Sequence, residues 1–214
     1  MTDVKKMLRV NALCTANVSK AKSVCDIVTA CCDGVQPNDG ITIFTPYTDT
    51  VTSGNIYLPD MLDESLLESA CDYLITSGAN AIVHAAYDME EAGIIEARYK
   101  LSPIMLLHKL GILSQCTIAG GVCLDNDDLD LMAQEGVPLV LLPTADAGYG
   151  HGFAPVCAAV HRGLRVGIGT FDGKYNKSAD LDCELRFLTL TANAEMRTEN
   201  ALDERTLKKI LAFD

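Results

Sequence analysis

The sequence predicts an α/β fold in which parallel strands alternate with helices. Six short runs rich in β-branched and small residues are each followed by a stretch whose apolar positions recur at helical spacing. Such alternation is typical of βα units joined by right-handed crossovers. No Gly-, Pro- or Ser-rich linker divides the 214 residues, so we expect one domain over residues 1–214.

The first part of the chain supplies two strands and two helices. Residues 8–14 (LRVNALC) predict a strand, and Ser19 is a candidate N-cap for a helix that reaches to about residue 32. A second strand is predicted over residues 41–44. A long polar loop follows over residues 45–60, and the apolar spacing from residue 64 to 76 predicts a helix.

The second part continues the same alternation. Strands are predicted over residues 79–86, 116–119, 137–142 and 165–170. Helices are predicted over residues 90–110, 125–134, 153–162, 178–193 and 202–211. Pro103 suits the first turn of a helix, so the segment 90–110 should divide into two helices there. Ser178 is a candidate N-cap for the helix that follows the last strand.

Composition limits the partners and the compartment. The chain has 17 basic and 29 acidic residues, a formal charge of −12, which disfavours binding to nucleic acid or to anionic membranes. No apolar run reaches the ~18 residues of a membrane span, and the N-terminus does not resemble a signal peptide. Nine cysteines without metal-binding spacing indicate reduced thiols. We therefore expect a cytoplasmic protein.

Strand and helix patterns alone do not distinguish an open sheet from a barrel. An open doubly wound sheet usually carries a glycine-rich phosphate loop after its first strand. The glycine-rich segment of this chain, residues 148–152 (GYGHG), instead follows the fifth predicted strand. A flexible loop is the simpler explanation for it.

A set of motifs resolves this choice by resemblance. They occur in order as IVHAA at 82–86, PIMLL and GIL at 103–113, TIAG at 117–120, LPTAD and GFAP at 142–155, and VGIGTFD with ELR at 166–186. Residues 81–186 thereby resemble the C-terminal part of the amidohydrolase superfamily barrel, in its chlorohydrolase and cytosine/guanine deaminase-like branch. The resemblance implies a partial TIM-like (β/α) barrel with about six βα units, corresponding to strands three to eight.

The resemblance also implies a metal centre at the mouth of the barrel. In that family a divalent metal is held by an H-x-H pair after strand one, a histidine on strand five, often a histidine on strand six, and an aspartate after strand eight. The metal activates a water for cleavage of a C–N bond. His84 corresponds to the strand-five histidine. Zinc or iron is the metal implied if the protein is active.

This sequence departs from that ligand pattern at several positions. The strand-six position is Gly120, and the strand-eight position falls on Phe171, with Asp172 one residue later. The carboxylate position after the strand-five histidine is Tyr87, with Asp88 next to it. No H-x-H occurs, because the histidines are at positions 84, 108, 151 and 161. The sequence therefore predicts a degenerate metal site.

The candidate site residues follow from these correspondences. Asp172 and Asp88 are candidate catalytic carboxylates, and His84 with Asp172 is the candidate metal pair. Candidate substrate-binding residues are Asp146, Tyr87 and His151. Two alternatives stay open: His84 as a satisfied pocket histidine, and Asp172 as a turn carboxylate.

Three hypotheses for function follow. The first is an amidohydrolase-like protein with most metal ligands lost, catalytically impaired or inactive alone. The second is a metal-dependent hydrolase or deaminase of C–N bonds in a small nitrogenous substrate, using His84, Asp172 and either Asp88 or Cys123. The third is a non-catalytic subunit. Six βα units leave open strand edges, and a full barrel typically needs about 250 residues. We therefore expect a homo-oligomer or a partner subunit that covers those edges; the alternatives are that the N- and C-terminal segments cover them or that the chain is a piece of a longer ancestral enzyme.

Overall fold

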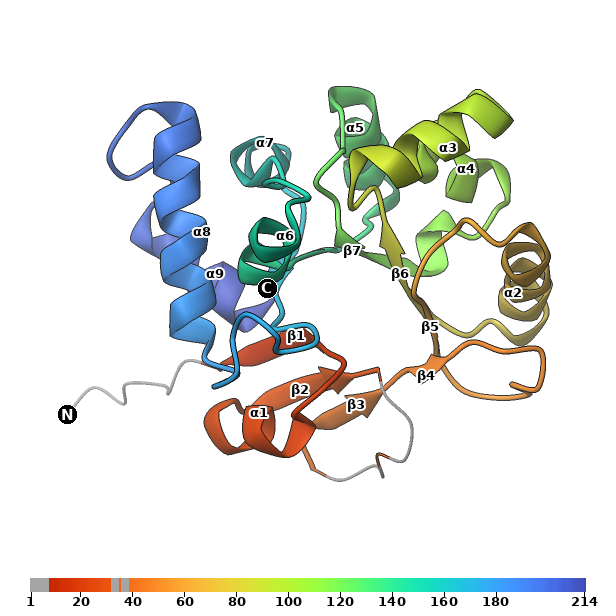
Figure 1. The fold of residues 1–214 in the computed structure, drawn as a ribbon, viewed down its shortest axis with the longest axis horizontal. Helices are drawn as coiled ribbons and strands as arrows, with labels where there is room; N and C mark the ends of the chain where they lie inside the picture. Colours follow the sequence, from red (N-terminus) through yellow and green to blue (C-terminus); the bar gives the residue numbers. More distant parts are fainter. Residues whose placement is uncertain (1–7, 32–34, 36–38) are drawn as a thin grey trace.

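The computed structural model describes residues 8–31, 35 and 39–214. In this part of the chain nine parallel strand segments form one sheet in the order β3-β2-β1-β9-β8-β7-β6-β5-β4. The strands are β1 (Val10–Cys14), β2 (Ile27–Ala30), β3 (Ile41–Ile43), β4 (Thr45–Pro46), β5 (Ile56–Leu58), β6 (Ala81–Ala85), β7 (Cys116–Gly120), β8 (Leu139–Leu141) and β9 (Val166–Ile168). Figure 1 shows the strands β1 to β7 around a ring, with helices such as α2, α3, α5 and α8 outside it.

The two ends of the sheet are consecutive pieces of chain. Only Phe44 separates β3 from β4. The Phe44 amide donates to the Ala30 carbonyl on the β2 side (2.9 Å), and the Thr45 amide donates to the Asn55 carbonyl on the β5 side (2.9 Å). Residues 41–46 therefore act as one strand with a neighbour on each side, and the sheet forms a nearly closed barrel.

Helices cover the outside of this barrel. They are α1 (Val18–Val24), α2 (Glu64–Ser77), α3 (Met89–Tyr99), α4 (Pro103–Lys109), α5 (Asn126–Glu135), α6 (Pro143–Tyr149), α7 (Val156–His161), α8 (Leu181–Met196) and α9 (Glu204–Ala212), with a 3₁₀ turn η1 (Leu113–Gln115). Strand residues alternate between two apolar clusters, as the pleat requires. Val83, Ile118 and Leu141 belong to the cluster shared with the helices, whereas Ile82 and Val140 belong to the inner cluster.

Phe213, near the end of the chain, packs against the inner cluster beside β9. A Cβ atom added to Gly167 would lie 2.5 Å from the ring of Phe213, so glycine is needed for this close approach. The guanidinium of Arg165 lies 4.8 Å from the centroid of the same ring. Phe213 also contacts the inner cluster. The segment after α9 thus fills one end of the barrel.

The sequence prediction of a parallel α/β barrel is confirmed, and several elements lie where they were predicted. Pro103 is the first residue of α4, which separates it from α3 as expected. Asp125 caps α5 with a reciprocal capping box to Asp128. No helix in the described ranges combines the length and the apolar character that a membrane span requires.

The predicted helix from residue 19 to 32 was wrong in its second half. The helix α1 is short and begins after Asn17 rather than Ser19, and the chain then forms β2. The β-branched run Ile27-Val28-Thr29 favours an extended backbone, and pairing with β1 and β3 satisfies it. The predicted end at residue 32 lies outside the described residues.

Two predicted loops contain regular structure. The polar segment 45–60 holds β4 and β5, and β5 is fully buried between its neighbours. Part of the predicted loop after β8 forms α6, with Pro143 at its first turn. Ser178 does not cap α8, because Asp180 holds that position and accepts from the Asp182 amide.

The barrel has more strands than the six expected. β3 and β4 are the two ends of the strand order, they follow each other along the chain at Phe44, and each pairs with one neighbour, β2 or β5, in the described residues. The predicted homo-oligomer or partner subunit stays a prediction.

Candidate functional site

The predicted site residues gather at the carboxyl ends of the barrel strands. His84 lies at the end of β6, and Tyr87 and Asp88 follow that strand directly. Asp146 and His151 follow β8, and Asp172 follows β9. Because all strand pairs are parallel, these segments emerge at the same end of the barrel. We call this end the mouth.

His84 is enclosed by aromatic rings at the mouth. Its side chain stacks on Tyr87, with ring centroids 4.3 Å apart and planes at 18°, and meets Phe171 at 5.2 Å. Burial, together with the charge of His151, lowers the pKa of His84 to about 4, so the imidazole is neutral near pH 7. Its buried Nε2 atom has no hydrogen-bond partner among the described residues. His84 is therefore a pocket histidine with one nitrogen unsatisfied.

His151 connects two loops across the mouth. Its Nδ1 atom lies 3.5 Å from Asp146 Oδ1, and its Nε2 atom lies 3.9 Å from Asp88 Oδ2. The imidazole also lies 5.4 Å from the ring of Tyr87. The three predicted substrate-binding residues, Asp146, Tyr87 and His151, are thus brought together.

Asp146 is a buried carboxyl whose proton affinity is increased. Burial first, and then the negative charge of Glu184, raise the pKa of Asp146 to about 8. The side chain is 3% exposed. Near neutral pH this carboxyl therefore holds a proton for a large part of the time.

Glu184, the acidic residue of the ELR motif, has a different environment. It is fully buried, and its carboxylate accepts from the Thr144 amide (3.0 Å), the Thr144 hydroxyl (2.6 Å) and Asn176 Nδ2 (2.8 Å). These bonds join the start of α6 to α8 and to the loop that carries Asp172. Glu184 of the ELR motif therefore stabilises the loops of the mouth through hydrogen bonds.

Asp172 faces the rim of the mouth. Its carboxylate accepts from the Tyr149 hydroxyl and from the Lys174 amide (2.9 Å). Phe171 has a positive φ of 48°, and its ring lies beside His84. Phe171 therefore contacts His84, while Asp172 has the contacts of a turn carboxylate.

The described residues do not fit the metal centre that the resemblance implies. At the strand-six position, a Cβ atom on Gly120 would lie 2.8 Å from Tyr87 Cβ and 3.1 Å from His84 Nε2, and the backbone φ there is 88°. A ligating side chain has no room. No group of three or more His, Cys, Asp or Glu side chains in the described ranges could hold a metal ion.

Sequence reasoning missed Glu91. This side chain is 1% exposed, and burial raises its pKa to about 8. One carboxyl oxygen accepts from the Tyr87 amide (3.3 Å), and the other, Oε1, has no partner in the described structure. Asp88 accepts from the Glu91 amide (2.7 Å) as the N-cap of α3. The D-x-x-E spacing of a capping box was the available signal.

Asp88 and Cys123, the alternative catalytic candidates, have structural contacts. Asp88 caps α3 and lies near His151, as described above. The Cys123 amide donates to the Ala86 carbonyl (2.7 Å). Burial and the charge of Glu91 raise the pKa of the Cys123 thiol, which disfavours the thiolate.

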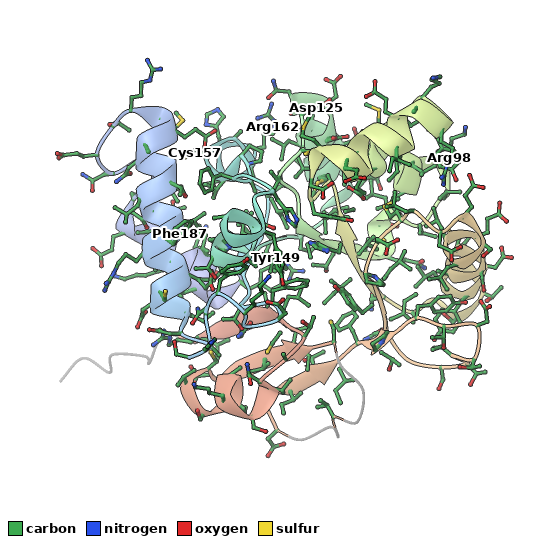
Figure 2. All side chains as sticks on the ribbon, in the orientation of Figure 1. Arg98, Asp125, Tyr149, Cys157, Arg162 and Phe187 are labelled. Atoms are coloured by element: carbon green, nitrogen blue, oxygen red, sulfur yellow. The ribbon has the colours of Figure 1, made fainter. Side chains whose placement is uncertain are left out.

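Sequence reasoning also missed the rim tyrosines. Tyr149 ends α6 and lies on the side of that helix that faces the ring of strands (Figure 2). Its ring stacks on His151 at 5.6 Å and meets Tyr175 edge-on at 5.2 Å. Flat aromatic faces beside carboxyl groups suit the binding of a flat or cationic nitrogenous compound.

The fold and the mouth define a parallel β/α barrel whose polar groups lie at the carboxyl ends of the strands. No family model matches the chain. It is 27% identical over 146 residues to a 5-methylthioadenosine/S-adenosylhomocysteine deaminase of Caldicellulosiruptor saccharolyticus, a match that covers 68% of this chain and 34% of that protein. The chain spans about a third of the length of the first curated relatives that it matches.

Solved structures show the same fold. A zinc-bound adenosine deaminase from Xanthomonas campestris has a TM-score of 0.67 at 20% identity, covering 83% of this chain and 40% of that one. A zinc-bound atrazine chlorohydrolase from Arthrobacter aurescens has a TM-score of 0.67 at 19% identity, covering 86% and 47%. The likeness to the amidohydrolase superfamily that the motifs indicated is confirmed by the sequence matches, and the fold agrees with it.

Proposed function

We propose that this chain is an amidohydrolase-like barrel that binds a small nitrogenous ring compound at its mouth and does not by itself perform metal-dependent hydrolysis. The observation that carries the proposal is the environment of His84. Its ring is buried against Tyr87 and Phe171, and Gly120 leaves no space for a neighbouring ligand. Three converging ligands are the minimum that a catalytic zinc requires.

The chemistry of the mouth supports ring binding. The rings of Tyr87 and Phe171, which lie against His84, supply aromatic surface at the mouth. Oε1 of Glu91 and Nε2 of His84 are buried and have no hydrogen-bond partner among the described residues, so a ligand admitted by movement of the surrounding side chains would satisfy them. The relatives named as methylthioadenosine deaminases suggest an adenine compound as the first probe.

Metal analysis and calorimetry test this proposal. The purified chain is incubated with Zn²⁺ or Fe²⁺, dialysed and analysed for metal, and 5′-methylthioadenosine is then titrated into it. We expect well under one metal per chain, no ammonia release, and heat of binding that is lost in Tyr87→Ala. Near-stoichiometric metal together with ammonia release would overturn the proposal, and so would an absence of binding.

The second candidate is a metal-dependent deaminase or hydrolase of C–N bonds. The names of the relatives favour it. It would use His84 and Asp172 with Asp88 or Cys123, and it requires Phe171 and Tyr87 to move away from His84. Replacement of His84 by Ala should then remove both metal and turnover, whereas His108→Ala, at an exposed helix position, serves as the matched control. Unchanged turnover in His84→Ala would exclude this candidate.

We also propose that the chain forms a homo-oligomer or associates with a partner subunit. The two ends of the strand order, β3 and β4, are the strands that such an association would cover. Analytical ultracentrifugation of the purified chain measures this directly. A single species at the 23.0 kDa monomer mass would contradict self-association.

A further inference from the structure

A lysine side chain at the rim of the mouth lies between two tyrosine rings. Lys174 Nζ is 4.3 Å from the centroid of the Tyr149 ring and 5.0 Å from that of Tyr175. The two rings meet at 87°, with centroids 5.2 Å apart. Two perpendicular aromatic faces around one cation form the core of an aromatic cage, the arrangement by which proteins bind ammonium groups.

A carboxylate completes this cage. Asp172 accepts from the Tyr149 hydroxyl and from the backbone amide of Lys174. A negative charge beside two π faces increases the attraction for a cation. We call Tyr149, Tyr175 and Asp172 the rim cage.

The walls of the rim cage are held in place by close packing. A Cβ atom on Gly148 would lie 2.5 Å from the Tyr175 ring, so that ring rests directly on the backbone of α6. Tyr149 stacks on His151, with planes at 19°. Both tyrosines are accessible, at 39% and 43% exposure. The cage is therefore preformed and open to solvent.

A second cation–π contact, between Arg98 and Tyr99, differs from the contacts of Lys174. Arg98 lies 5.9 Å from the single ring of Tyr99 and is paired with Glu64. That is an ordinary surface contact between neighbouring residues. Lys174 instead lies near two rings, and one of them, Tyr149, belongs to a different element, α6. The formal charge of −12 also draws organic cations toward the protein.

We propose that the rim cage binds the cationic nitrogen of a small organic ligand, and that Lys174 is an internal occupant that the ligand displaces. This proposal rests on the proposed function and deepens it, because it adds to the mouth a subsite for a positively charged group. The ligand class is an alkylated or protonated amine, with its remaining part directed toward His151 and Tyr87.

Choline and its neutral isostere 3,3-dimethylbutan-1-ol test the charge requirement. Both are titrated into the wild-type chain and into Lys174→Met, which keeps a stem of similar length without the charge. We expect choline to bind roughly two- to fivefold more tightly to Lys174→Met, and the neutral isostere to bind at least fivefold more weakly than choline. Arg98→Met is the matched control and should leave choline affinity unchanged.

Two further variants test whether the Tyr175 ring contributes to choline binding. Tyr175→Ala should weaken choline binding about tenfold or more, whereas Tyr175→Phe should keep most of it, because the π face is retained. Thermal unfolding of each variant identifies any loss that comes from misfolding. Equal binding of choline and the isostere, or no gain in Lys174→Met, would overturn the rim cage.

These outcomes are separable from those of the proposed function. Choline binding depends on Tyr149, Tyr175 and Asp172, whereas 5′-methylthioadenosine binding and metal content depend on His84 and Tyr87. Loss of methylthioadenosine binding with intact choline binding would overturn the proposed function alone. Loss of choline discrimination with intact methylthioadenosine binding would overturn the rim cage alone.

Discussion

Two buried carboxylates of this barrel have opposite surroundings. Between α6 and α8, Glu184 accepts three hydrogen bonds, and each donor has a defined place in the fold. At the mouth, Glu91 has one oxygen without a partner, and His84 has an unpartnered Nε2 atom. Since buried polar groups are normally paired, the first region has the properties of a structural network and the second has those of a binding site.

The two regions differ in what their buried carboxylates contribute to the protein. The Glu184 network fixes how the loops after β8 and β9 approach each other, independent of any ligand. The unpaired atoms of His84 and Glu91 reduce stability unless something binds them. The following predictions test this distinction, beginning with the largest effect.

Removal of the Glu184 carboxylate should be the most damaging change. Glu184→Ala leaves the Thr144 amide, the Thr144 hydroxyl and Asn176 without their acceptor inside the protein, so we expect a loss of about 3–5 kcal/mol in the free energy of unfolding. Glu184→Gln should lose less, because one acceptor oxygen is kept. Urea denaturation measures both. A loss below about 1 kcal/mol in Glu184→Ala would show that this network is not structural.

Glu91 should make stability depend on pH. Its pKa is raised from 4.5 to about 8 on folding, so its contribution to stability is complete below pH 4.5 and is lost as the pH rises through 8. At about 1.4 kcal/mol per pH unit between pH 4.5 and pH 8, the loss is on the order of 5 kcal/mol. Glu91→Gln should flatten the profile over this window, leaving the slope from Asp146, which has the same sign.

Urea midpoints between pH 4.5 and pH 8.5 measure the effect of Glu91. Glu90→Gln, at an exposed position in the same turn of α3, is the matched control and should keep the wild-type slope. If the urea midpoint changed with pH equally in the wild type and in Glu91→Gln, Glu91 would be solvated. It would then not be one of the buried groups at the mouth that lack a hydrogen-bond partner.

A methyl group at position 120 should disturb the His84 stack. Gly120→Ala places Cβ 2.8 Å from Tyr87 Cβ at a positive φ, and we expect a loss of about 2–3 kcal/mol. Gly136→Ala also has a positive φ, but nothing lies within 4 Å, so only the conformational cost of about 1 kcal/mol is expected. Equal losses in the two variants would show that the close contact at Gly120 relaxes freely.

The smallest effect should come from the rim. Tyr149→Phe removes the hydrogen bond to Asp172, and because both groups are accessible the loss should be about 0.5–1 kcal/mol. Thermal unfolding measures it. A loss comparable to that of Glu184→Ala would place Asp172 in the structural network.

The second half of the chain was more predictable than the first for physical reasons. Helices such as α5 carry a capping box and an apolar stripe, and both signals are local in sequence. By contrast, β4 and β5 contain two and three residues, too few to establish a period. Their extended conformation depends on pairing with distant strands, which the local sequence does not contain.

The location of the site could be predicted, but its contacts could not. Parallel strands place His84, Asp146 and Asp172 at one end of the barrel once the strand order is known. That Phe171 rather than Asp172 lies beside His84 depends on a positive φ for a non-glycine residue, which the sequence does not indicate. Burial of Glu91 depends on the packing of α3.

The join at Phe44 gives the barrel a defined weak point for local opening. The Phe44 and Thr45 amides bond to opposite neighbours, and β3 and β4 contribute only three and two residues to the ring. Amide hydrogens there should exchange with solvent sooner than those of β6 and β7, which pair over five residues. Local opening of the strand pairing at Phe44 would therefore leave the loops that carry His84 and Asp146 in place.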